Sequence, residues 1–121
     1  MISPDQAHRF AVRWIEAWNR HDVAGVLSHY ADDVEWSSPF IPRILGEPSG
    51  VLRGKAAVRA YVERGLERYP DLQFELLGVF PGVSSVTLHY RSVNQLLAAE
   101  VLEFGDSGLI RRVLCHYAEP T

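Results

Sequence analysis

The sequence predicts a single α+β domain, residues 1–121, in which helices come first and an antiparallel sheet follows. The 121 residues are the length of one ordinary domain. Apolar residues recur at helical spacing in the first half and in strand-like runs in the second, a segregation that favours α+β over alternating α/β. Hydrophobic residues make up 47% of the chain and charged residues 22%, which is typical of a globular protein with a buried core.

The first helix is predicted to begin after Ser3, because Ser3, Pro4 and Gln6 form a helix-start signal. Ser3 caps the helix, Pro4 fits the first helical position, and Gln6 closes a capping box. An apolar stripe of about four turns follows, in which aromatic residues recur every four positions: Phe10, Trp14 and Trp18.

Two more helices and a short strand are predicted before the main sheet. Asp22 is expected to cap a shorter second helix, and residues 34–36 alternate like a short strand. Residues 37–53 are rich in proline and glycine but carry apolar side chains, so we expect a long loop that rims a pocket. Gly54 opens the third helix, and Pro70 ends it.

Four strand-like runs complete the chain, at residues 72–80, 84–93, 96–104 and 109–117. Short turn signals between them predict an antiparallel meander. Asn94 and Gln95 are the predicted two-residue turn of the middle hairpin. With that turn His89 pairs with Glu100, and Arg91 lies one step along the same face.

The predicted register also assigns the faces of the sheet. The face that carries His89 and Glu100 is expected to line a pocket. The opposite face is expected to be apolar and to form a homodimer interface; its residues on these two strands are Val86, Leu88, Tyr90, Ala99 and Val101. A one-residue slip at the turn would separate His89 from Glu100, so the pair depends on the register.

Charge and residue counts exclude several classes of function. The formal net charge of −3 argues against nucleic acid as a partner and gives no reason to expect a membrane surface. Cys115 is the single cysteine, so no internal disulfide or cysteine-rich zinc site is predicted. The five histidines lack metal-ligand spacing, and no metal is predicted. No signal peptide or bilayer-spanning run is found, so a cytoplasmic location is expected.

Four segments together resemble the nuclear transport factor 2-like superfamily, and its SnoaL-like branch in particular, which includes polyketide cyclases and lies near the ketosteroid isomerases. The segments are Ala-Trp-Asn-Arg-His-Asp at 17–22, His-Tyr-Ala-Asp-Asp-Val at 29–34, Gly-Lys-Ala-Ala-Val-Arg at 54–59, and residues 100–117 with their Gly-Asp-Ser-Gly turn. The resemblance covers nearly the whole chain. It implies a cone-shaped curved sheet around a deep pocket that three N-terminal helices close, and a homodimer through the outer sheet face.

The chemistry of the ketosteroid isomerases is not matched by this chain. By the resemblance, their general-base aspartate falls on Ser38, which cannot shuttle a proton between carbon atoms near neutral pH. Their oxyanion-hole tyrosine falls on Trp14, and their protonated aspartate falls on Glu100. A pocket phenylalanine falls on Tyr61, so Tyr61 is expected to point inward. The Asp–Arg–Asp relay of the related epoxide hydrolases is not matched either.

The leading hypothesis is an enzyme of the SnoaL-like type that needs no cofactor and performs proton transfer, cyclisation or dehydration on a hydrophobic, aromatic or polyketide-like substrate. His89 would be the base, Glu100 the acid that orients it, and Arg91 the group that stabilises an anion. The predicted ligand-binding wall is mostly aromatic: Trp14, Trp18, Trp36, Ser38, Phe40, Tyr61, Cys115 and Tyr117.

Two alternatives stay open. The first is a non-catalytic module that binds an apolar ligand in the same cone, and it differs from the enzyme in whether His89 and Glu100 lie within hydrogen-bond distance in an open cavity. The second is a structural dimerisation domain whose cone is filled by its own aromatic side chains. It predicts no cavity of ligand size, which is typically about 300 Å³ or more.

Overall fold

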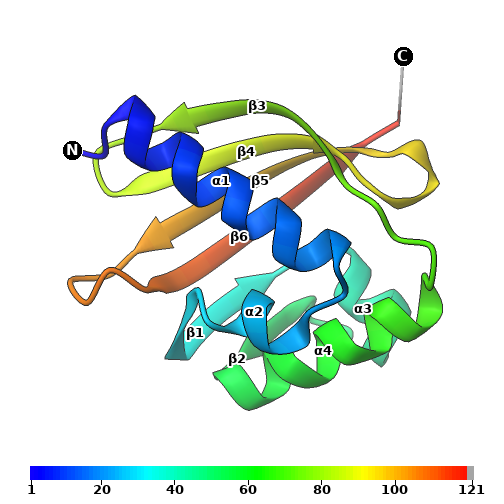
Figure 1. The fold of residues 1–121 in the computed structure, drawn as a ribbon. Coiled ribbons are helices and arrows are strands. Elements are labelled where there is room, and N and C mark those ends of the chain that lie inside the picture. The colour runs from blue at the N-terminus through cyan, green and yellow to red at the C-terminus, as the bar shows by residue number, and fades with distance from the viewer. Residues whose placement is uncertain (120–121) are drawn as a thin grey trace.

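The computed structural model describes residues 1–119 and shows a strongly curved, unclosed six-stranded sheet with helices on its concave side (Figure 1). The strand order is β2-β1-β6-β5-β4-β3, in which β1 and β6 are parallel and the other neighbours antiparallel. The elements are α1 (Pro4–Asn19), α2 (Val23–Leu27), β1 (Tyr30–Ser37), α3 (Phe40–Leu45), β2 (Val51–Arg53), α4 (Lys55–Arg68), β3 (Glu75–Pro81), β4 (Ser85–Arg91), β5 (Leu97–Phe104) and β6 (Ile110–Ala118).

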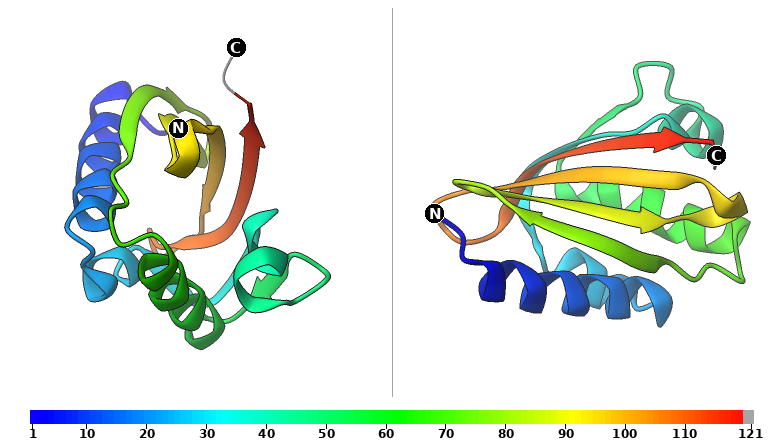
Figure 2. Two further views of the ribbon diagram at one scale, coloured as in Figure 1. Left: turned by 90° about the vertical axis from the view of Figure 1, so that its right-hand side faces the viewer. Right: turned by 90° about the horizontal axis from the view of Figure 1, so that it is seen from above.

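The sheet and the helices together form a cone. Figure 2 shows, on the left, α1 and α4 facing the curled strands across a central core, and, on the right, the fan of strands above α1. The predicted α+β cone is therefore confirmed. No helix in the described part of the chain is long and apolar enough to cross a membrane.

Helix α1 begins as the sequence predicts. The Ser3 hydroxyl accepts a hydrogen bond from the Gln6 backbone N–H at 3.1 Å, and the Gln6 side chain accepts one from the Ser3 N–H at 2.9 Å. The aromatic stripe of α1 faces the sheet. At its centre Trp14 is 0% exposed, and its indole N–H donates to the Tyr30 hydroxyl at 2.9 Å. This stripe holds α1 against the concave side of the sheet.

The segment expected to be a long loop contains two elements that the sequence analysis missed. Helix α3 covers Phe40–Leu45, and the short strand β2 pairs with β1. Phe40 and Ile41 of α3 are buried, which explains why a proline- and glycine-rich segment carries apolar side chains. Gly46 ends α3 with a backbone φ of 74°, a conformation that glycine adopts without strain.

The register between β4 and β5 differs from the prediction by one residue. Asn94 and Gln95 do form a two-residue turn, with backbone φ of 56° and 63°. However, the Ser92 N–H donates to the Leu96 carbonyl at 2.7 Å, and the Leu96 N–H donates to the Val93 carbonyl at 3.2 Å. Ser92 and Val93 therefore oppose the single residue Leu96, a β-bulge that shifts every pair beyond it.

The bulge reverses the predicted faces of β4. Glu100 pairs with Leu88, whereas His89 pairs with Ala99. The apolar residues Val86, Leu88 and Tyr90, which were expected on the outer face, are buried inside the cone. His89 and Arg91 lie on the outer face instead. Burial of the apolar set explains the outcome, because a one-residue slip would turn three apolar side chains toward solvent.

The outer face of the sheet is consequently more polar than expected. Arg91 donates to the Glu75 carboxylate at 3.3 Å, and Arg112 lies 3.7 Å from the Glu35 carboxylate. The exposed His116 also lies on this face. The homodimer through the outer face stays a prediction.

Candidate functional site

A cavity lies at the end of the cone where the segment between α4 and β3 and the turn between β4 and β5 approach each other (Figure 2, left). It is lined by residues from helices and strands: Trp18, Trp36, Phe40, Ile44, Tyr61, Val62, Gly65, Tyr69, Leu72, Phe74, Tyr90, Ser92, Val93, Glu100, Cys115 and Tyr117. Its volume is about 50 Å³. The cavity is therefore a narrow slot.

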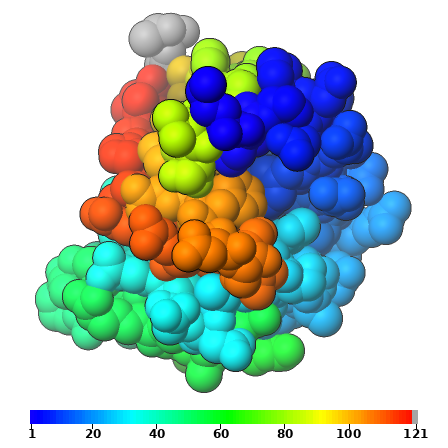
Figure 3. Space-filling view, turned by 90° about the vertical axis from the view of Figure 1, so that its left-hand side faces the viewer, coloured from blue at the N-terminus to red at the C-terminus, as the bar shows by residue number. Residues whose placement is uncertain are grey.

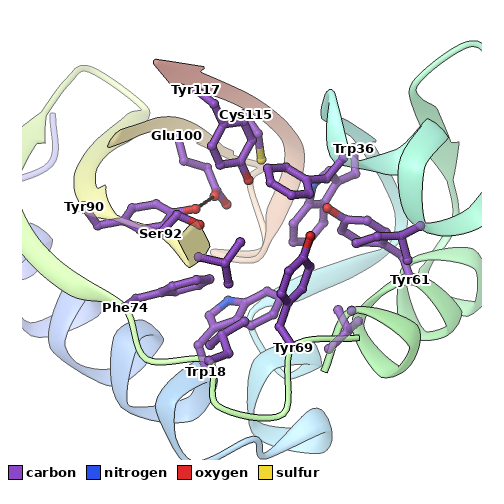
Figure 4. Close-up of a pocket in the computed structure, with 16 residues that line it drawn as sticks. Trp18, Trp36, Tyr61, Tyr69, Phe74, Tyr90, Ser92, Glu100, Cys115 and Tyr117 are labelled. Atoms are coloured by element: carbon purple, nitrogen blue, oxygen red, sulfur yellow. Dashed lines mark hydrogen bonds between the residues drawn. The ribbon is translucent and has the colours of Figure 1, made fainter. Parts of the chain in front are cut away.

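Aromatic rings form two walls of this slot (Figure 4). On one side the ring centroid of Phe74 lies 5.4 Å from that of Trp18 and 4.8 Å from that of Tyr90. On the other side Trp36 and Tyr61 are 5.9 Å apart, and Phe40 and Tyr117 are 4.7 Å apart. Ring pairs at such distances pack favourably, so the contacts within each wall stabilise that wall and leave the space between the two walls unfilled.

Glu100 is the carboxylic acid of the slot. It lies on β5, its side chain points into the cone, and it is only 2% exposed. The Tyr90 hydroxyl donates a 2.6 Å hydrogen bond to its Oε1 atom. Its Oε2 atom is buried and has no hydrogen-bond partner in the described part of the chain. A buried carboxyl oxygen without a partner is costly, and most such groups in proteins are paired with protein or water.

Burial raises the pKa of Glu100 from 4.5 to about 7, although the Tyr90 hydroxyl and the Cys115 thiol favour the ionised form. Cys115 lies opposite Glu100 on β6, and burial raises the pKa of its thiol as well. The thiol is therefore protonated near neutral pH, which makes it a poor nucleophile. Glu100, in contrast, is present in both protonation states near pH 7, as an acid–base catalyst requires.

Two more buried polar atoms of the lining have no partner. The indole nitrogens of Trp18 and Trp36 are buried and make no hydrogen bond within residues 1–119. Figure 4 shows Trp18 and Glu100 directed into the same space from opposite sides. Together with Glu100 Oε2, these atoms present two donors and one carboxyl oxygen to the slot. The lining also carries the hydroxyl groups of Tyr61, Tyr69, Ser92 and Tyr117, so the site combines apolar ring surfaces with several polar groups (Figure 4).

The structure brings seven of the predicted residues into the cavity lining: Trp18, Trp36, Phe40, Tyr61, Glu100, Cys115 and Tyr117. Trp14 and Ser38 do not line it. Trp14 packs behind the wall in the core, and Ser38 is buried with its hydroxyl accepting the Phe40 N–H at 3.1 Å. His89 and Arg91 lie on the opposite face of the sheet, so the expected triad with Glu100 is not assembled.

Tyr90 is the most informative residue that sequence reasoning missed. It was assigned to the outer face through the register, yet its hydroxyl contacts Glu100. The alternation of β4 carried the necessary signal, since Val86, Leu88 and Tyr90 are its apolar set and belong on the buried face. Five of the other missed residues lie in the bulge or in the segment after α4, where no periodic pattern exists: Tyr69, Leu72, Phe74, Ser92 and Val93. The last three lie on α3 and α4: Ile44, Val62 and Gly65.

The opposite end of the molecule carries a second depression, between the N-terminal segment, the turn after β3 and the turn after β5 (Figure 3). It is lined by polar and apolar groups, among them Arg13, His29 and Asp106. Burial lowers the pKa of His29, and the Arg13 charge acts in the same direction. Its volume of about 570 Å³ is open to solvent, and it holds none of the three buried unpaired side-chain atoms of the described chain. The slot is therefore the stronger candidate site.

Comparison with known proteins assigns the family. The profile of the SnoaL-like domain matches residues 11–113. The chain belongs to the SnoaL-like family. A SnoaL-like protein of unknown function from Burkholderia thailandensis E264 is 48% identical over 98% of both chains, with a TM-score of 0.93. The search of curated proteins found no match.

More distant SnoaL-like and related structures share the fold. A protein from Agrobacterium tumefaciens strain C58, proposed to be an isomerase of the SnoaL-like family, is 16% identical over 95% of this chain and 99% of its own, with a TM-score of 0.76. AclR from Streptomyces galilaeus, proposed to be a hydroxylase, is 20% identical over 96% and 91% of the two chains, with a TM-score of 0.73. At these identities the likeness establishes the cone alone.

Proposed function

We propose that this SnoaL-like protein binds a small hydrophobic molecule in the slot and that Glu100 transfers a proton on it. The observation that carries the proposal is the buried Glu100 carboxyl, whose pKa of about 7 and unpartnered Oε2 atom make it an acid–base group in an apolar site. Tyr90 holds the carboxyl in place through Oε1 and leaves Oε2 free for the ligand.

The proposed step is balanced without a cofactor. The Glu100 carboxylate removes a proton from a carbon next to a carbonyl group of the ligand, and the electron pair of that bond forms an enolate. An indole N–H of Trp18 or Trp36 stabilises the enolate oxygen. Glu100 then returns the proton to a different atom of the ligand, which isomerises it, or to the same carbon, which exchanges it with solvent. His89 takes no part, because it lies on the other face of the sheet.

Two observations bear on the alternatives. The slot is smaller than about 300 Å³, which favours a cone filled by its own side chains. A filled structural core, however, gives no reason to keep three buried polar atoms without partners. A ligand that hydrogen-bonds to these atoms accounts for them, and it needs only small side-chain movements to enter. The non-catalytic binder uses the same atoms without the proton transfer.

Exchange of ligand hydrogen with solvent tests the proton transfer. The probe is 1-phenylpropan-2-one, a single-ring ketone, dissolved in D₂O near neutral pD. The wild-type protein should accelerate deuterium uptake next to the carbonyl above the buffer rate, as NMR measures. Glu100→Gln should lose this acceleration, because the amide cannot accept the proton; on the scale of general acid–base catalysis the loss is about 100-fold or more.

A matched control and a second readout separate the alternatives. Glu103→Gln changes a carboxyl of the same strand that faces outward, and it should exchange like the wild type. Native mass spectrometry of the protein as purified, before and after denaturation, reports any retained small molecule. If a molecule is retained and the wild type and Glu100→Gln exchange equally, the enzyme hypothesis is contradicted and the non-catalytic binder is supported. If no molecule is retained and no exchange is seen, the structural role is supported.

A further inference from the structure

The charge and the size of a molecule decide whether it fits the slot. We infer that the ligand is an uncharged molecule with one planar ring and a hydrogen-bond-accepting oxygen, and that the slot excludes carboxylates, phosphates and multi-ring compounds. This inference deepens the proposed function and rests on it, since it concerns the ligand of the same site. Three features of the lining carry it.

The first feature is the absence of positive charge. None of the sixteen lining residues is a lysine, arginine or histidine, and Glu100 is the single carboxylic acid among them. An anionic ligand would lose its hydration, would find no positive charge in the slot, and would lie beside a carboxyl that is partly ionised. Burial of an unpaired charge is strongly unfavourable, so a carboxylate or phosphate should bind poorly.

The second feature is the set of unpaired donors. The indole N–H groups of Trp18 and Trp36 need an acceptor, and an ammonium group has none to offer. An organic cation would pair with Glu100 but would leave both indole groups unsatisfied. A carbonyl oxygen accepts from an indole N–H, while a hydroxyl or amide group of the same molecule reaches Glu100 Oε2. An uncharged ligand with both kinds of group satisfies the indole N–H groups and Glu100 Oε2 together.

The third feature is the shape of the slot. The Trp18–Phe74–Tyr90 wall and the wall of Trp36 and Tyr61 lie on opposite sides of it, with their rings tilted or edge-to-face to one another (Figure 4). The space between them is small, about 50 Å³, so a single ring needs the smaller movement of the walls, whereas three fused rings would have to displace them. A multi-ring compound is therefore excluded.

Charged side chains are present near the slot but outside it. Arg68 and Asp71 line a separate groove at the mouth, together with Gln73 and the turn residues Asn94 and Gln95. This groove shares Tyr69, Leu72, Ser92 and Val93 with the slot. A ligand that enters here passes from a groove with charged side chains into a slot that has no positively charged side chain. The selection against anionic ligands takes place at this step.

Matched probes test the inference at pH 7. They are 4-hydroxybenzamide, 4-hydroxybenzoate and 4-hydroxybenzylamine, which share one ring and differ in charge, and anthracene-2-carboxamide, which keeps the amide but has three rings. Dissociation constants come from NMR titrations that follow the indole N–H signals of Trp18 and Trp36. The neutral single-ring amide should shift these signals and bind at least about tenfold more tightly than each of the others.

Glu100→Gln provides the decisive variant. Without the carboxyl, the preference for amide over carboxylate should shrink severalfold, whereas Glu103→Gln should keep it. Carboxylate, ammonium or three-ring binding within twofold of the amide would overturn the inference, as would no binding by any probe. Exchange that depends on Glu100 would still support the proposed proton transfer in those cases. Amide-selective binding without such exchange would support the ligand class and overturn the transfer.

Discussion

Glu100→Gln should stabilise the protein by about 3 kcal/mol at pH 8 and by less than about 1 kcal/mol at pH 5. The pKa of Glu100 is raised from 4.5 to about 7 in the folded state, mainly by burial. Below pH 4.5 the carboxyl is protonated in both states and costs nothing. Between pH 4.5 and 7 the unfolded chain releases the proton that the folded protein keeps, so stability falls as pH rises. Above pH 7 the full difference in stability is reached, and it amounts to about 1.4 kcal/mol for each pH unit between the two pKa values.

Urea unfolding at pH 5 and pH 8 measures this difference. The glutamine side chain keeps an oxygen acceptor for the Tyr90 hydroxyl, replaces the other oxygen with an NH₂ group and removes the charge, so the variant should show a flatter pH dependence than the wild type. Glu103→Gln should follow the wild type at both pH values, because Glu103 faces outward beside Arg112. An equal gap between wild type and Glu100→Gln at the two pH values would show that Glu100 titrates like an exposed carboxyl.

Trp14→Ala should destabilise the protein by about 3–5 kcal/mol, the range for removal of a large buried aromatic side chain. Trp14 is fully buried between α1 and the sheet, and its ring contacts Trp18, Phe74 and Tyr90 at centroid distances of 6.1, 6.1 and 5.3 Å. The substitution opens a void and also leaves the Tyr30 hydroxyl without its indole donor. Denaturant unfolding at one pH measures the loss.

Two further variants show that the loss belongs to this position. Trp14→Phe should lose less than Trp14→Ala, since the ring is partly retained while the hydrogen bond to Tyr30 is lost. Phe80→Ala removes an aromatic ring that is 59% exposed on β3 and should change stability by about 0.5 kcal/mol or less. A Trp14→Ala loss as small as that of Phe80→Ala would contradict the packing described for α1.

Much of the fold was predictable because local signals and tertiary packing agree. The Ser3–Gln6 capping box and the spacing of Phe10, Trp14 and Trp18 were read correctly, since a cap and a buried stripe are encoded within a few residues. Helix α3 was missed because its proline and neighbouring glycines resemble a loop, and its formation depends on burial of Phe40 against the cone.

The site was predicted in part, and the misplaced His89 and Arg91 have a single physical origin. The Asn94–Gln95 turn was identified correctly, but no residue type announces the bulge at Ser92 and Val93 that precedes it. The extra residue in this bulge shifts the register by one, so that His89 is separated from Glu100 and Tyr90 contacts Glu100 instead. The inward position of Glu100 and the aromatic wall were still recovered, because the family resemblance and the alternation of β6 do not depend on that turn.

The pKa of Glu100 is the quantity on which the account depends most directly. A ¹³C NMR titration of the glutamate side-chain carboxyls follows it, with the Glu100 signal assigned by its loss in Glu100→Gln. The account predicts a midpoint near 7, well above the ordinary 4.5. A Glu100 midpoint near 4.5 would mean that the carboxyl is solvated in the ionised form at neutral pH, and it would contradict the proposed proton transfer.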